Sequence, residues 1–178
     1  MNVFISGGCK NGKSFFAQRK AKEMAENCGK PLYYIATMIP HDDEDRARIK
    51  RHISERDGWG FETVEQGRNL AEILDMPDVD NSGVFLLDSV TALLSNEMFD
   101  DSGNFNDAAA EHVREDVLKF AKGTGNTVFV SDFIYSDAAG YDRLTEEYRR
   151  GLAMIDRALA AECEEVWETA YGLQERWK

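Results

Sequence analysis

Two groups of residues in this sequence carry side chains suited to chemistry on phosphate groups. The first is the glycine-rich run Gly7-Gly8-Cys9-Lys10-Asn11-Gly12-Lys13-Ser14, which fits the pattern G-x-x-x-x-G-K-[ST]. In such a loop, glycines let backbone N–H groups turn toward phosphate oxygens, the lysine reaches the outer phosphates and the hydroxyl binds Mg²⁺. We therefore expect these eight residues to bind a nucleoside triphosphate, with Lys13 as a catalytic residue and Ser14 as a metal ligand.

A second Mg²⁺ ligand is expected at the end of a later apolar segment. Residues 83–88 read Gly-Val-Phe-Leu-Leu-Asp, a buried strand that closes on the carboxylate of Asp88. A hard cation bound to phosphates takes oxygen ligands, so a carboxylate beside the glycine-rich loop favours a metal role for Asp88. Because hydrophobic strands often end in Asp, the metal role of Asp88 is indicated only in combination with the glycine-rich loop.

The second group surrounds His52. Five cations lie within eleven residues of a strongly acidic chain, namely Arg46, Arg48, Lys50, Arg51 and Arg56. Their spacing alone is equally compatible with a solvated helix face that carries charge pairs and with a basic site for phosphate.

The elements that must position these residues alternate between strands and helices. Apolar β-rich runs predict strands at 2–6, 32–37, 61–65, 83–88, 127–131 and 165–171. Helical periodicity and capping residues predict helices at 13–27, 42–56, 69–74, 89–98, 106–122 and 143–161. Residues 132–142 are expected to form a loop and the last residues a short tail. This order predicts a single α/β domain over 1–178, with an open, mainly parallel sheet, helices on both faces and ligands at the strand carboxyl ends.

Charge and cysteine content restrict the binding partners and the cellular compartment that we expect for this chain. The chain has 178 residues and a net charge of −12, which argues against nucleic acid or an anionic membrane as the main partner. Its three cysteines, Cys9, Cys28 and Cys163, are odd in number and lack metal-ligand spacing, so we expect reduced thiols in a cytoplasmic protein. No apolar run approaches the ~20 residues of a membrane span.

The whole pattern resembles one family, the bifunctional adenosylcobinamide kinase/adenosylcobinamide-phosphate guanylyltransferases of cobalamin biosynthesis. The resemblance rests on the order and spacing of several short segments. They are the loop Gly7 to Ser14, Tyr34-Ile35-Ala36-Thr37, Asp43-Glu44, Arg48-Ile49-x-x-His52, Thr63-x-Glu65, Leu86-Leu87-Asp88-Ser89-Val90-Thr91, Leu94-Ser95-Asn96, Arg143-Leu144, Tyr148-Arg149 and Ala158 to Trp167.

This resemblance implies a RecA-like P-loop fold, Mg²⁺, ATP and GTP as substrates, and self-association as a homotrimer. It implies phosphorylation of adenosylcobinamide, followed by transfer of GMP from GTP to adenosylcobinamide phosphate through a covalent intermediate on His52. A neutral imidazole is a competent nucleophile near pH 7. By resemblance, the guanine nucleotide would also contact Ala36, Thr37, Met38, Ile53, Ser54, Glu55, Arg56 and Glu65.

The chain departs from the family pattern after the fourth apolar strand. The family carries Asn-Glu-Val-Gly there, whereas this chain has Asp132-Phe133-Ile134-Tyr135-Ser136-Asp137, and Asp156 stands where Asn is common. Besides a bifunctional enzyme, a paralogue with one half-reaction, a different small-molecule kinase and a non-catalytic nucleotide-binding regulator stay open. The sequence contains no N-K-x-D segment of the kind that reads guanine in signalling GTPases.

Overall fold

The computed structural model describes residues 1–40, 42–100 and 102–178, and within the second helix it leaves out the side chains of Asp45, Arg48, His52 and Glu55. One seven-stranded sheet organises the chain, with strand order β3-β2-β4-β5-β1-β6-β7. Its strands are β1 (Val3–Gly7), β2 (Leu32–Ala36), β3 (Glu62–Glu65), β4 (Val84–Asp88), β5 (Thr127–Asp132), β6 (Glu165–Ala170) and β7 (Leu173–Arg176). All neighbouring strands run parallel except β7, which pairs antiparallel with β6.

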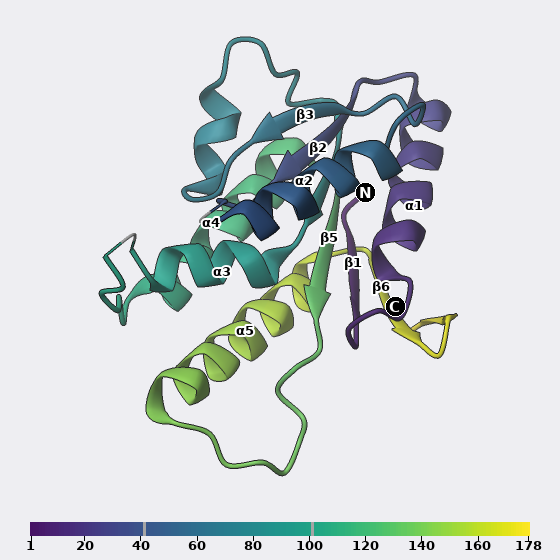
Figure 1. The fold of residues 1–178 in the computed structure, drawn as a ribbon. Coiled ribbons are helices and arrows are strands. Elements are labelled where there is room, and N and C mark those ends of the chain that lie inside the picture. Colours follow the sequence, from purple (N-terminus) through teal and green to yellow (C-terminus); the bar gives the residue numbers. More distant parts are fainter. Residues whose placement is uncertain (41, 101) are drawn as a thin grey trace.

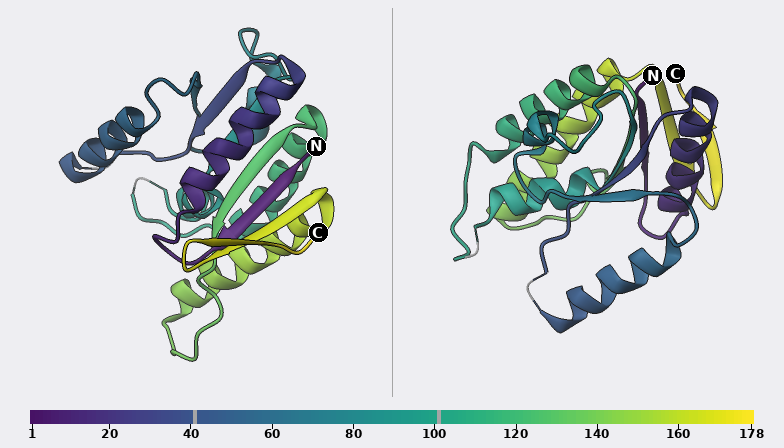
Figure 2. Two further views of the ribbon diagram at one scale, coloured as in Figure 1. Left: turned by 90° about the vertical axis from the view of Figure 1, so that its right-hand side faces the viewer. Right: turned by 90° about the horizontal axis from the view of Figure 1, so that it is seen from above.

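Helices cover both faces of this sheet (Figure 1). They are α1 (Lys13–Cys28), α2 (Asp43–Glu55), the 3₁₀ helix η1 (Leu70–Asp75), α3 (Val90–Met98), α4 (Ala109–Thr124) and α5 (Arg143–Glu162). Helix α1 packs on one face, and α3, α4, α5 and η1 gather on the other. Helix α2 stands apart from both layers (Figure 2).

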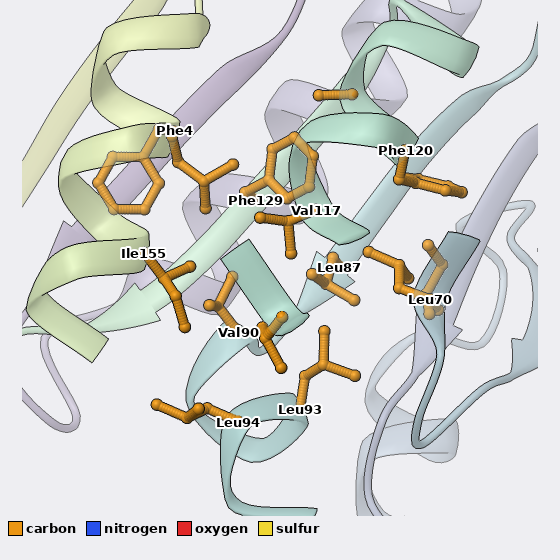
Figure 3. Packing of buried hydrophobic residues seen from close by; sticks show 14 of the residues in the cluster. Phe4, Leu70, Leu87, Val90, Leu93, Leu94, Val117, Phe120, Phe129 and Ile155 are labelled. Atoms are coloured by element: carbon orange, nitrogen blue, oxygen red, sulfur yellow. The ribbon is translucent and has the colours of Figure 1, made fainter. Parts of the chain in front are cut away.

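The alternation of side chains along each strand divides the core into two parts. On β1, Phe4 faces the layer of α3, α4 and α5, whereas Val3 and Ile5 face α1. The larger part is drawn in Figure 3, where Phe129, Leu87 and Val117 lie at the centre of the packed side chains. Burial of these apolar surfaces on both faces explains why the strands read as continuous hydrophobic runs.

The predicted α/β architecture is confirmed, with differences at three places. The expected tail forms strand β7, whose four residues are all exposed, so no hydrophobic alternation marked it. Asp132 belongs to β5 rather than to the following loop. Helix α4 begins at Ala109, because Asn106 uses its carboxamide oxygen to accept a bond from the Ala108 backbone in the preceding turn.

Among the described residues, no helix is both long enough and apolar enough to cross a membrane.

Candidate active site

The glycine-rich loop joins the carboxyl end of β1 to the first turn of α1. Gly7 lies between β5 and β6, and a Cβ atom at this position would come within 2.3 Å of the Thr169 carbonyl oxygen. Gly12 caps α1 with a φ of 84°, a left-handed conformation that favours glycine. The strand, loop and helix predicted from the sequence are therefore present, and the N-terminus of α1 faces the loop.

Lys13 lies under this loop. Its side chain is 8% exposed, and its ammonium nitrogen donates hydrogen bonds to the Gly8 carbonyl and to Oδ1 of Asp132, both at 2.8 Å. The ammonium group is thus held at the carboxyl edge of the sheet, where a nucleotide phosphate can replace either acceptor.

The oxygen donors expected for Mg²⁺ fit that cation. Ser14 lies in the first turn of α1, and Asp88 is the last residue of β4. Within the described ranges, no group of three acidic, histidine or cysteine side chains is close enough to form a metal site from protein alone. A P-loop Mg²⁺ needs few protein ligands, because phosphates and water complete its shell. The Ser14 hydroxyl and the Asp88 carboxylate would hold it.

Asp132 is a site residue that the sequence interpretation missed. It pairs with Gly7 across the sheet, its backbone N–H donates to Oγ1 of Thr91 at 2.9 Å, and its carboxylate binds Lys13. The signal was available in principle, because an acid at the end of a strand next to the glycine-rich loop must lie beside the phosphates.

The turn that follows β2 is held in place by hydrogen bonds of Thr37 to residues near and within α3. Thr37 is buried, and its hydroxyl accepts a hydrogen bond from the Ser89 N–H at 3.3 Å. Asn96 donates to the Thr37 carbonyl at 2.7 Å, which fixes this turn to α3. Ala36 and Met38 are half-buried beside it, and Glu65 is exposed at the end of β3, next to Ala36 across the sheet.

Arg56 and Ile53 line a hollow of about 430 Å³, where the chain turns from α2 toward β3. The guanidinium carbon of Arg56 lies 3.5 Å from the centre of the Tyr34 ring, and Arg56 is buried. Phe61 and Thr63 also line this hollow. The exposed Ser54 precedes Arg56 by two residues.

One aromatic contact joins this hollow to the first turn after the glycine-rich loop. Phe15, directly after Ser14, packs edge-on against Trp59 with ring centres 5.7 Å apart. Trp59 lies between Gly58 and Gly60, which both line the hollow. His52 lies in α2, four residues before Arg56, which follows the end of this helix. The side chains of His52 and Glu55 are outside the described part of the structure.

The divergent loop after β5 is tied to α5. Tyr135 donates a hydrogen bond to Oδ2 of Asp156 at 3.0 Å, and Arg149 forms ion pairs with Asp137 at 3.1 Å and with Glu146 at 2.8 Å. Burial raises the pKa of Asp156 to about 7; the Asp132 charge adds to this rise, and the Ser131 and Tyr135 hydroxyls oppose it. These contacts hold the loop after Asp132 against α5.

The fold and this site define a P-loop nucleotide-binding protein. A profile of the family "cobinamide kinase / cobinamide phosphate guanyltransferase" matches residues 3–176. The chain belongs to this family of enzymes, and the predicted family resemblance is confirmed.

Curated proteins of cobalamin biosynthesis align with this chain over nearly its full length. The chain is 26% identical to the bifunctional adenosylcobalamin biosynthesis protein CobU of Escherichia coli, with 97% of each chain covered. It is 27% identical to CobU of Salmonella typhimurium, again with 97% of each covered. The bifunctional protein CobP of Pseudomonas aeruginosa is 28% identical, with 97% of this chain and 95% of that one covered.

Solved structures support the RecA-like P-loop fold. The flagellar accessory protein FlaH of Methanocaldococcus jannaschii matches with a TM-score of 0.52 and 15% identity, over 99% of this chain and 77% of that one. A KaiC-like protein of Pyrococcus horikoshii has the same TM-score and identity, over 94% and 69% of the two chains. At this identity the likeness concerns the fold alone.

Proposed function

We propose that this chain phosphorylates adenosylcobinamide and then transfers GMP from GTP to the product, through a covalent GMP on His52. The observation that carries the proposal is the position of Lys13, buried under a glycine-rich loop and paired with the strand-end carboxylate of Asp132, in a chain that belongs to the cobinamide kinase family. The relatives' names describe bifunctional enzymes of adenosylcobalamin biosynthesis.

In the kinase reaction, the loop amides and Lys13 bind the outer phosphates. Lys13 leaves the Asp132 carboxylate for the phosphates, where its charge stabilises the negative charge that develops during transfer. Mg²⁺, when bound by Ser14 and Asp88, supplies further neutralisation of the phosphates. The remaining work of the chain is to align the γ-phosphoryl group with the acceptor hydroxyl.

In the guanylyl reaction, an imidazole nitrogen of His52 attacks the α-phosphorus of GTP and pyrophosphate leaves. The phosphate of the acceptor then displaces the imidazole and takes the GMP. The hollow beside Arg56 is the proposed seat of the guanine nucleotide, because it combines a buried cation, the Phe61 ring and the chain segment that follows His52. Guanine has a flat aromatic face that an aromatic side chain can stack against.

Two further properties belong to this proposal. The active form is a homotrimer, as the family resemblance implies, and the protein acts in the cytoplasm, which agrees with three cysteines that lack a disulfide or metal-ligand pattern. Sedimentation of the purified protein would test the trimer directly.

Intact-mass spectrometry of the protein with GTP and Mg²⁺ tests the covalent step. We expect an adduct of one GMP that is lost in mild acid, is absent in His52→Ala and persists in the control His112→Ala. His112 is an exposed histidine on α4. An adduct retained in His52→Ala would contradict the nucleophile assignment.

Phosphorylation of cobinamide with ATP or GTP, followed by mass spectrometry of the corrinoid, tests the other half. Phosphoryl transfer without any protein adduct would indicate a kinase alone. Nucleotide binding without either product would indicate a regulator. The two assays together therefore separate the proposed function from each alternative.

A further inference from the structure

Asp132 stands at the mouth of the phosphate site, beyond the carboxylate assigned to Mg²⁺. Asp132 is in register with Gly7, the first residue of the glycine-rich loop, whereas Asp88 is in register with Val130. The two acids on neighbouring strands are therefore offset by two residues, or about 7 Å along the strand direction. Asp88 lies deeper in the sheet edge, and Asp132 lies level with the loop.

The backbone of Asp132 is fixed while its carboxylate stays accessible. Its N–H donates to Thr91 Oγ1 at 2.9 Å, and the next N–H, of Phe133, donates to the Gly7 carbonyl at 2.9 Å. Tyr148 in turn donates to the Thr91 carbonyl at 2.9 Å. The Asp132 side chain is still 31% exposed, so a substrate group can reach it.

Nucleotide binding must change the partner of this carboxylate. Lys13 has one ammonium group, which contacts Asp132 at 2.8 Å here and is the group that a P-loop directs at the outer phosphates. When the ammonium turns to phosphate, the Asp132 carboxylate loses this cation and stays level with the first residue of the glycine-rich loop. A carboxylate in that place repels phosphate but attracts the proton of a neutral hydroxyl.

We propose that Asp132, which stands where the family carries Asn, is in this chain the proton acceptor for the hydroxyl that receives the phosphoryl group. This inference rests on the proposed kinase activity. The O–H bond breaks as its proton passes to a carboxylate oxygen of Asp132, and the hydroxyl oxygen bonds to the γ-phosphorus. The bond between that phosphorus and the bridging oxygen breaks, which releases the nucleoside diphosphate.

The test compares wild type, Asp132→Asn and the control Asp137→Asn in cobinamide phosphorylation, and measures nucleotide affinity and the Mg²⁺ requirement for each. Asp137 is a matched control, because it also pairs with a cation, Arg149, but lies in the loop after β5. Removal of a general base lowers rates by about 10²–10⁴-fold. We expect that loss in kcat for Asp132→Asn, with unchanged Mg²⁺ requirement and undiminished nucleotide affinity.

Other outcomes would overturn the inference. Tighter nucleotide binding with an unchanged kcat would make Asp132 a mere counter-ion of Lys13, and a raised Mg²⁺ requirement with weaker binding would make it a metal ligand. An active wild type with an equally active variant overturns this inference alone. A wild type that transfers no phosphoryl group overturns the proposed kinase function and this inference with it.

Discussion

The Tyr135 hydroxyl donates to a carboxylate oxygen of Asp156 at 3.0 Å, which ties the loop after β5 to a buried position on α5. Asp156 is only 3% exposed, and burial raises its pKa to about 7. Between the ordinary aspartate pKa of 3.8 and about 7, the folded chain binds more protons at Asp156 than the unfolded chain does. The contribution of Asp156 to the free energy of unfolding therefore falls as pH rises through this interval.

Asp156→Asn should remove this pH dependence. We expect a higher free energy of unfolding than wild type at pH 8, on the order of 2–4 kcal/mol, with a difference that shrinks toward pH 4. Urea unfolding from pH 4 to pH 8 measures it, with the exposed Asp78→Asn as control. Parallel curves for wild type and Asp156→Asn would contradict the role of burial.

Lys13→Ala should abolish phosphoryl transfer. The variant loses the cation that neutralises charge developing on the transferred group, an effect on the order of 10²-fold or more in kcat. Nucleotide affinity should also fall, as measured by calorimetry. Lys122→Ala on α4, whose ammonium pairs only distantly with Glu162 at 4.0 Å, is the control. A variant with wild-type turnover would exclude Lys13 from catalysis.

Gly7→Ala should destabilise the fold and disturb the loop. The added methyl group would overlap the Thr169 carbonyl oxygen at 2.3 Å, so β1 and β6 must separate locally. Overpacking of this kind costs typically 1–3 kcal/mol. Gly140→Ala is the matched control, because nothing lies within 4 Å of a Cβ atom there. Equal thermal midpoints for the two variants would show that β1 and β6 can move apart at Gly7 without loss of stability.

Arg56→Ala should weaken the guanylyl half-reaction more than the kinase half-reaction. The substitution removes a buried guanidinium stacked on Tyr34 at the hollow proposed for guanine. A hydrogen bond between this cation and the nucleotide would contribute about 1.5–3 kcal/mol, so we expect at least about a tenfold loss in GMP-adduct yield at subsaturating GTP. The control is Arg51→Ala, an exposed cation on α2. A larger loss of GMP-adduct yield in Arg51→Ala than in Arg56→Ala would contradict this assignment and place the guanine site on the surface of α2.

Much of the architecture could be predicted because the signals were local. Strand β1, the glycine-rich loop and α1 follow one another within a few residues, and buried strands such as 84–88 are continuous apolar runs. Strand β7 gave no such signal, since all four of its residues are exposed and its pairing depends on β6.

The site was harder to predict because it is assembled across the sheet. Lys13 and Asp132 are 119 residues apart in sequence, and their ion pair depends on β5 lying next to β1. The same is true of Arg56 and Tyr34, whose stacking no spacing rule predicts. Thr37 shows that polarity at a strand end is an ambiguous signal, because its hydroxyl accepts a hydrogen bond from the Ser89 N–H, a structural role that the sequence does not distinguish from contact with a ligand.

The pairing at the start of β6 brings the two ends of the chain together. The Asn2 carbonyl accepts a bond from the Glu164 N–H, and the Lys178 carbonyl accepts one from the Val166 N–H. Both ends therefore meet at the edge of the sheet away from the glycine-rich loop. The N- and C-termini lie close together on the side of the sheet opposite the glycine-rich loop. A tag or surface anchor fused at either terminus would therefore leave the nucleotide-binding edge accessible.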